Sequence, residues 1–215
     1  MNVLRTLPNP LRRHQLTKIV QPYTLVGPER IHSLYNLARR IEDEHVPGDV
    51  VECGVCNGGT AAVLGHFATR SKRDRILWLL DSFEGMPETT PEDGEAAPAH
   101  IGKEVGDLTR VEEVLNRVDV EMQRVRIIKG WFQEIFPSLS ISQVALLNID
   151  ADWYKSVRLC LDTFYDLVPQ GGFISIDDYG HWPGCRQAVD EFFLDRRINY
   201  KLHEVDYTAR WFQKL

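Results

Sequence analysis

The stretch DVVECGVCNGGT, residues 49–60, decides the fold. Its first five residues predict a short strand, and the glycines after them predict a tight turn that leads into a helix at about residues 60–70. A strand, a glycine-rich turn and a helix in this order are typical of the βαβ units that build parallel sheets. We therefore expect an α/β fold.

The same alternation continues outward from this stretch. Short apolar runs predict further strands at residues 76–80, 125–129, 144–149 and 173–176. Segments with helical periodicity predict helices at residues 28–46, 107–119, 155–167 and 187–196, and the last twenty residues predict a closing hairpin. We expect one domain, residues 23–215, with a mostly parallel sheet and helices on both faces. Residues 1–22 are expected to form a loosely ordered arm or a dimer-contact segment.

Bulk composition narrows the function. A chain of 215 residues suits one domain, and its formal net charge of −6 argues against a nucleic-acid binder. No apolar run approaches the ~18 residues of a membrane span, so we expect a cytoplasmic protein. Cys53 and Cys56 form a CxxC pair without a second ligand pair at zinc-site spacing, which favours reduced thiols packed near a turn.

The first turn predicts a nucleotide-like ligand other than NAD. The dinucleotide fingerprint needs a second glycine where Cys56 stands, and that glycine admits the pyrophosphate. Asp81 ends the next strand, where a carboxylate can accept hydrogen bonds from ribose hydroxyls. A capping or loop role is the alternative for Asp81. The combination favours S-adenosylmethionine, which has a ribose but no phosphate.

Four aspartates follow two neighbouring strands. Asp150 and Asp152 follow the strand at 144–149, and Asp177 and Asp178 follow the strand at 173–176. Because parallel strands end at the same edge of a sheet, these carboxylates should converge there and repel each other unless a cation neutralises them. Oxygen ligands favour a hard ion such as Mg²⁺. Helix capping, or pairing with Lys155, Arg158 or Arg186, is the alternative.

Three other features of the sequence have more than one interpretation or suggest a further role. Trp131 is suited either to stacking on an adenine or to core packing. His181 is suited either to contact with the substrate or to a surface loop. The segment at residues 84–106 is rich in Pro, Gly, Glu and Ala, and a loop of this length is often an active-site lid.

Taken together, these blocks resemble the macrocin O-methyltransferase family, which includes sugar O-methyltransferases of macrolide and aminocoumarin biosynthesis. The resemblance spans about residues 22–212 and leaves the N-terminal arm outside it. The matching blocks are Tyr23-Thr24, Pro47-Gly48-Asp49, Val51-Glu52-Cys53-Gly54-Val55, Asp81-Ser82-Phe83-Glu84-Gly85-Met86-Pro87, Gly130-Trp131-Phe132, Asp150-Ala151-Asp152-Trp153-Tyr154-Lys155-Ser156, Asp177-Asp178-Tyr179 and Gly184-Cys185-Arg186-Gln187-Ala188-Val189-Asp190. Ala151 stands where a glycine is familiar in the family.

The resemblance implies a class I methyltransferase sheet of seven strands, Rossmann-like, with S-adenosylmethionine and Mg²⁺ as cofactors. It implies that Asp150, Asp177 and Asp178 bind the metal and that Asp152 is the general base. The cofactor-binding residues expected from the motifs and the preceding arguments are Thr24, Glu52, Gly54, Asp81, Ser82 and Trp131. The expected acceptor is a sugar or glycoside, and a homodimer is a family-level expectation. A catechol-type O-methyltransferase and a nicotinamide-dependent oxidoreductase are the rival interpretations.

Overall fold

Seven strands form a single sheet in the order β3-β2-β1-β4-β5-β7-β6 in the computed structural model, which describes residues 9–215. The first five strands are parallel, β7 is antiparallel to β5, and β6 is antiparallel to β7. The predicted fold class, including the closing antiparallel hairpin, is confirmed. The strands are β1 Asp49–Cys53, β2 Leu77–Asp81, β3 Val125–Lys129, β4 Val144–Ile149, β5 Phe173–Ile176, β6 His203–Glu204 and β7 Arg210–Gln213.

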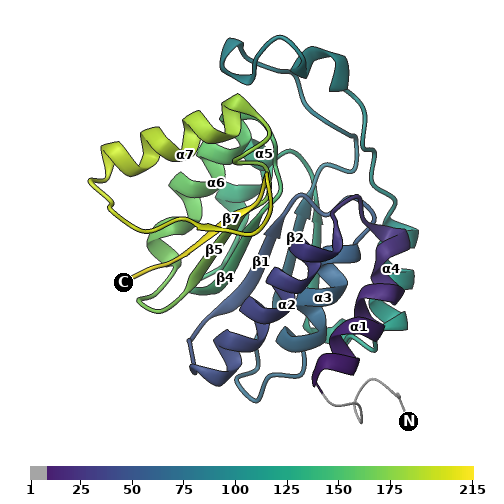
Figure 1. Cartoon of the computed structure of the whole chain (residues 1–215). Helices are drawn as coiled ribbons and strands as arrows, with labels where there is room; N and C mark the ends of the chain where they lie inside the picture. The colour runs from purple at the N-terminus through teal and green to yellow at the C-terminus, as the bar shows by residue number, and fades with distance from the viewer. Residues whose placement is uncertain (1–8) are drawn as a thin grey trace.

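Helices cover both faces of this sheet (Figure 1). One layer contains α1 Asn9–Val20, α2 Pro28–Asp43, α3 Gly59–Ala68 and α4 Leu108–Arg117, and the other contains α5 Phe132–Ile135, α6 Tyr154–Phe164 and α7 Pro183–Asp195. Successive strand residues point to opposite faces, so Val50 packs in the core under the first layer and Val51 in the core under the second. None of the helices among residues 9–215 is both long and apolar enough to span a bilayer.

The N-terminal segment differs from the prediction. Residues 9–20 form α1, whose Leu16 and Val20 are fully buried against the first core. The expectation of a loosely ordered arm is therefore wrong for this helix, while residues 1–8 of the arm lie outside the described residues. Only two of its twelve residues are buried, which is too weak a pattern to predict a helix from sequence.

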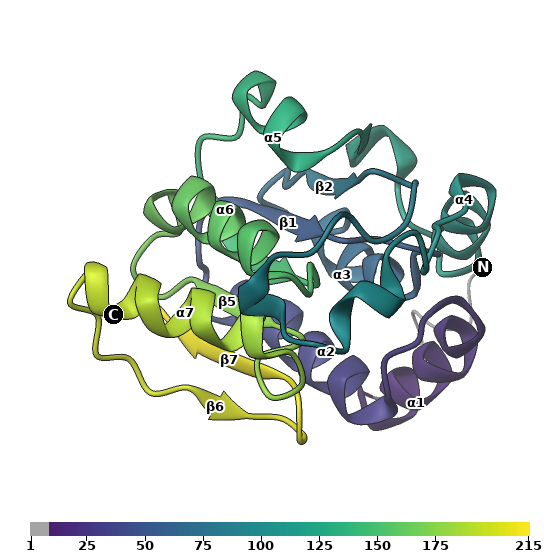
Figure 2. The ribbon, with the colours of Figure 1, turned by 90° about the horizontal axis from the view of Figure 1, so that it is seen from above.

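The segment at residues 84–106 is closed at its neck and tied to the second helical layer. Met86 N donates to Lys103 O at 2.8 Å, and Gly102 N donates to Met86 O at 2.9 Å. Buried Asp93 accepts from Tyr154 N, the first residue of α6, at 2.6 Å. In the view from above (Figure 2), this segment passes over the carboxyl ends of the strands.

Those strand ends are positioned by backbone hydrogen bonds that continue beyond the strands. Asp150 N donates to Cys53 O at 2.9 Å, and Asp177 N donates to Ile149 O at 2.9 Å. The strand order reverses direction at β1, which lies between β2 and β4, and ligands of open α/β sheets bind at such a switch point. The topology therefore places the residues after β1, β2, β4 and β5 around one site.

Candidate active site

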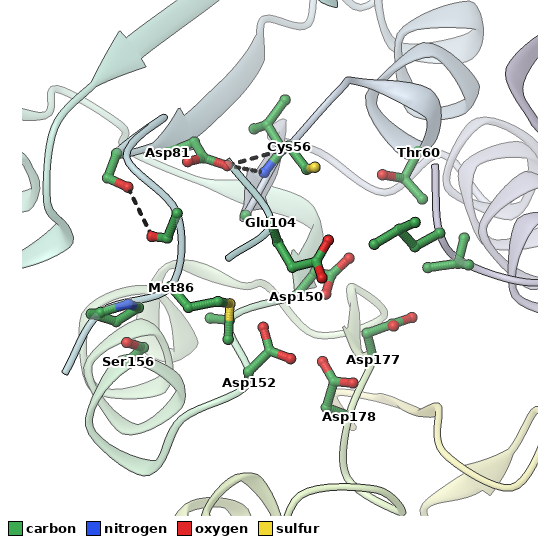
Figure 3. A pocket seen from close by; sticks show the side chains of 18 of the residues that line it. Cys56, Thr60, Asp81, Met86, Glu104, Asp150, Asp152, Ser156, Asp177 and Asp178 are labelled. Carbon is green, nitrogen blue, oxygen red and sulfur yellow. Dashed lines mark hydrogen bonds between the residues drawn. The ribbon is translucent and has the colours of Figure 1, made fainter. Parts of the chain in front are cut away.

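A cavity of about 350 Å³ lies at this edge of the sheet. It is lined by all of the predicted site residues except Glu52. Figure 3 shows that the side chains gather in two groups, with Asp81 and Cys56 on one side and the aspartates that follow β4 and β5 on the other. We call these the cofactor half and the aspartate half.

Asp81 organises the cofactor half. Its Oδ2 accepts from Val55 N at 2.6 Å and from Cys56 N at 2.9 Å, and its Oδ1 accepts from Phe83 N at 2.7 Å. A carboxylate has about four acceptor positions, so roughly one, on Oδ1, is left for a ligand hydroxyl. Asp81 therefore both fixes the first turn and presents an acceptor to the cavity, which combines the two roles considered from sequence.

Gly54 joins the two halves. Its φ is +88°, a conformation that favours glycine, and a Cβ at this position would lie 1.8 Å from Asp150 O. The backbone after β1 can therefore approach the backbone after β4 only because residue 54 has no side chain. This close approach brings the first turn and the aspartates into one cavity.

Cys56 occupies the place of the missing dinucleotide glycine. It has a left-handed backbone with φ of 47°, and it lines the cavity. Burial raises the pKa of its thiol to about 11, so this cysteine stays protonated near neutral pH. All four cysteines are free, and Cys53 and Cys56 lie at the turn after β1.

Glu52 lies beneath the cavity and is fully buried. Its Oε1 accepts from Asn148 Nδ2 at 3.0 Å, whereas its Oε2 has no hydrogen-bond partner. Burial raises the pKa of Glu52 to about 8, although hydrogen bonds from Thr60 and Asn148 oppose this shift. Glu52 thus supports the floor of the cofactor half as a protonated group near pH 7.

The side of the cavity that contains Thr24 packs against the start of α3. A Cβ on Gly59 would lie 2.6 Å from the Thr24 Cβ, so glycine at this position lets the segment carrying Thr24 pack against α3. Trp131 also lines the cavity, just before α5. Its position suits the stacking role better than the core role.

The aspartate half brings together Asp150, Asp177 and Asp178. One carboxylate oxygen from each lies within 4.8 Å of the others, a spacing that fits a shared cation. Asp178 Oδ2 is buried without a hydrogen-bond partner, so it lacks the compensation that a buried carboxylate oxygen needs. The donor set and this orphaned oxygen both fit a hard divalent cation.

Burial and mutual repulsion disfavour the charged forms of these carboxylates. Desolvation, followed by the neighbouring carboxylates, raises the pKa of Asp150 and of Asp178 well above the ordinary range. Desolvation also raises the pKa of Asp177, to about 6, while the charge of Arg30 opposes the shift. A cation would reverse this balance, since opposite charge favours the ionised form.

Asp152 lies beside this group with a different environment. Its backbone is left-handed, with φ of 52°, and its Oδ1 accepts from Trp182 Nε1 at 3.0 Å. Desolvation, followed by the charge of Asp177, raises its pKa to about 7. A carboxylate with this pKa is matched to proton transfer near neutral pH.

Two charged residues line the cavity that the sequence did not predict as site residues. Arg30, from the first turn of α2, forms an ion pair with Asp177, and Glu104, from the 84–106 segment, lines the cavity near enough to Asp152 for its charge to help raise the pKa of that residue. The alternative that Arg158 or Arg186 pairs with the aspartates is wrong. Arg158 binds Asp162 and Asp195 at 2.9 and 2.8 Å, and Arg186 Nε donates to Tyr179 O.

His181 belongs to the rim of the cavity. Its ring lies 4.6 Å from the Trp182 ring, and its Nδ1 lies 3.5 Å from the Tyr207 hydroxyl. All three residues line the cavity. The interpretation of His181 as a residue placed to contact the substrate therefore agrees with its position.

Comparisons with known proteins agree with this geometry. The model of the macrocin O-methyltransferase family matches residues 7–214, so the match begins well before residue 22 and includes α1. A demethyldecarbamoylnovobiocin O-methyltransferase of Streptomyces niveus is 32% identical over 89% of this chain and 76% of its own length. A mycinamicin III 3''-O-methyltransferase of Micromonospora griseorubida is 32% identical over 86% of this chain and 75% of its own length.

A solved structure extends the agreement to the fold. The structure of the O-methyltransferase NovP superposes with a TM-score of 0.80 at 30% identity, over 89% of this chain and 82% of that one. The enzyme class that the motifs implied, an S-adenosylmethionine-dependent O-methyltransferase, is thereby confirmed. The chain belongs to the macrocin O-methyltransferase family.

Proposed function

We propose that this enzyme transfers a methyl group from S-adenosylmethionine to a hydroxyl of a sugar or glycosylated natural product, in a reaction that depends on Mg²⁺. The observation that carries this proposal is the convergence of Asp150, Asp177 and Asp178 beside Asp152, in the same cavity as the turn held by Asp81. The acceptor class is supported by the name of a third relative, the 8-demethyl-8-(2,3-dimethoxy-alpha-L-rhamnosyl)-tetracenomycin-C 4'-O-methyltransferase of Streptomyces olivaceus, which specifies a rhamnosyl group.

The cofactor half would bind the adenosyl part. The free acceptor position of Asp81 suits a ribose hydroxyl, and Trp131 offers an aromatic face to the adenine. Cys56 places a side chain on the cavity where the dinucleotide fingerprint has a glycine, which disfavours the nicotinamide alternative. Gly54 lets the backbone approach the ligand closely.

Asp150, Asp177 and Asp178 would hold the metal. Bound Mg²⁺ supplies a Lewis acid that orients neighbouring acceptor hydroxyls and makes one of them more acidic. The three aspartates hold their carboxylates in the place where this charge is needed, with Asp177 and Asp178 buried and Asp150 half-buried. Low exposure strengthens these electrostatic interactions.

Asp152 would accept the proton from the acceptor hydroxyl as the methyl group is transferred. Its hydrogen bond from Trp182 fixes the carboxylate, which leaves the other oxygen for the substrate. Alignment of the acceptor oxygen with the methyl carbon and sulfur would then provide much of the rate acceleration. The 84–106 segment, which contributes Met86, His100 and Glu104 to the cavity, would help exclude water.

Chelation followed by a substrate screen tests the proposal. Methyl transfer to a panel of vicinal-diol sugars and glycosides should disappear after treatment with EDTA and return with added Mg²⁺, as measured by mass spectrometry. Full turnover by metal-free enzyme would contradict the metal dependence. Turnover of catechols in preference to every sugar would favour the catechol-type alternative.

A further inference from the structure

The cavity has a strong excess of acidic over basic side chains. Six carboxylates line it, namely Asp81, Glu104, Asp150, Asp152, Asp177 and Asp178. Among the residues that the structure describes, Arg30 is the only lysine or arginine on the lining. Its guanidinium is therefore the one permanent positive charge that this part of the chain supplies to the cavity.

Arg30 is held between two carboxylates from different segments. Its Nη1 forms an ion pair with Asp177 Oδ2, and its Nε lies 3.2 Å from Asp206 Oδ2 in the turn between β6 and β7. The Arg30 side chain is 16% exposed, so both interactions are shielded from water. Arg30 thus contacts one candidate metal ligand and one carboxylate outside the metal group.

Asp206 is itself fixed. Its Oδ1 accepts from Thr208 N at 3.0 Å and from Ala209 N at 2.8 Å, which leaves Oδ2 directed toward Arg30. The Thr208 hydroxyl donates to Asp177 O at 2.8 Å and ties this turn to the residue after β5. The structure therefore holds Asp206 as a rigid second partner for the guanidinium.

We propose that Arg30 is the resident counter-cation of the aspartate half, competing with the divalent cation for Asp177 and withdrawing to Asp206 when that cation binds. This inference rests on the proposed function, because it requires a metal at Asp150, Asp177 and Asp178. Two positive groups in contact with one buried carboxylate repel each other, so occupancy by one weakens the other. Arg30 thereby lowers the affinity of the empty site for metal.

Mn²⁺ binding, measured by calorimetry and by the loss of the free-ion signal in electron paramagnetic resonance, tests this inference without reference to turnover. Arg30→Met keeps the apolar stem but removes the charge. It should bind Mn²⁺ about tenfold more tightly than wild type, the scale of one hydrogen bond to a charged group. Arg39→Met is the matched control, because Arg39 is on the same helix but pairs with Asp43 at the surface. Its Mn²⁺ affinity should equal that of wild type.

Asp206→Asn separates withdrawal from simple charge repulsion. Removal of the second partner should leave Arg30 on Asp177 and weaken Mn²⁺ binding, but the same substitution should have no further effect in an Arg30→Met background. Equal weakening in both backgrounds would overturn the withdrawal step. Arg30→Lys keeps a positive charge, so its Mn²⁺ affinity should lie closer to that of wild type than the Mn²⁺ affinity of Arg30→Met does. This variant replaces Arg30→Met in the test if the methionine variant does not fold.

The outcomes distinguish this inference from the proposed function. If wild type and all variants bind no Mn²⁺, both the metal site and the role of Arg30 are contradicted. If wild type binds Mn²⁺ and Arg30→Met binds equally or more weakly, Arg30 orients Asp177 rather than competing for it, and only this inference fails.

Discussion

The two halves of the active-site cavity satisfy their polar groups in different ways. In the cofactor half, both oxygens of Asp81 accept backbone hydrogen bonds, three in all, before any ligand binds. In the aspartate half, one oxygen of Asp178 has no partner, and the pKa values of Asp150 and Asp178 are raised because burial disfavours their charge. Preorganisation in the first half comes from the backbone, whereas the second half contains a buried oxygen that the described residues leave without a partner and that the proposed cation would compensate.

This difference indicates where free energy is stored. Buried, mutually repelling carboxylates oppose folding unless they are protonated or neutralised. A bound cation would relieve that cost, so binding and stability are linked in the aspartate half. The cofactor half carries no comparable penalty at Asp81. Substitutions in the two halves should therefore have separable effects on cofactor affinity, metal affinity and stability.

The largest effect is expected from Asp152→Asn. Loss of the proton acceptor should lower kcat by roughly 10²–10⁴, the usual contribution of general base catalysis. Affinity for S-adenosylhomocysteine should stay within about twofold of wild type, because Asp152 belongs to the aspartate half. Steady-state kinetics and calorimetry measure the two quantities. Asp162→Asn is the control, because Asp162 is bound to Arg158 on the outer side of α6. Full activity of Asp152→Asn would exclude the base role.

The next effect concerns Gly54, where the two halves meet. Gly54→Ala should destabilise the protein by about 3 kcal/mol or more, because left-handed strain adds to a clash with Asp150 O. Gly102→Ala is a matched control, since Gly102 also has a positive φ of 70° but nothing lies within 4 Å of its added Cβ. It should lose only about 1–2 kcal/mol. Equal denaturant midpoints for the two variants would show that the backbone relaxes away from the clash.

A smaller and more selective effect is expected from Asp81→Asn. The amide would face the Val55 and Cys56 N–H groups with a donor in place of an acceptor, or lose its contact with the ribose. Affinity for S-adenosylhomocysteine should fall about 10- to 100-fold, the scale of one or two hydrogen bonds to a charged group. Mn²⁺ affinity should not change. A parallel loss of both affinities would mean that the two halves are a single unit.

The sequence predicts the framework of both halves better than their details. Apolar runs of strand length identify the central strands, and the rule that parallel strands end at one edge brings Asp150 and Asp177 together without a structure. The ion pair of Arg30 joins residues 147 positions apart, and helical periodicity alone does not indicate which helix reaches the cavity. The left-handed backbones of Cys56 and Asp152 are equally hidden, because neither residue type marks such a conformation as glycine does.

A pH-dependent effect concerns Glu52, a fully buried carboxyl group of which one oxygen is unpaired. Its pKa rises from 4.5 to about 8 in the folded protein, so between these values the folded state binds a proton that the unfolded state has released. The contribution of Glu52 to stability is therefore fully present below about pH 4.5 and is lost as the pH rises toward 8. Glu52→Gln stays neutral at every pH and retains an amide oxygen for Asn148.

Relative to wild type, Glu52→Gln should thus gain about 1.4 kcal/mol of unfolding free energy for each pH unit between pH 5 and 7. Denaturant unfolding in EDTA at several pH values measures this difference. Glu95→Gln is the control, because Glu95 is exposed. Its unfolding free energy should depend on pH in the same way as that of wild type. If the unfolding free energy of Glu52→Gln also has the same pH dependence as that of wild type, Glu52 is ionised in the folded protein. The cofactor half would then also contain a buried charged carboxylate, and the contrast between the two halves would be smaller.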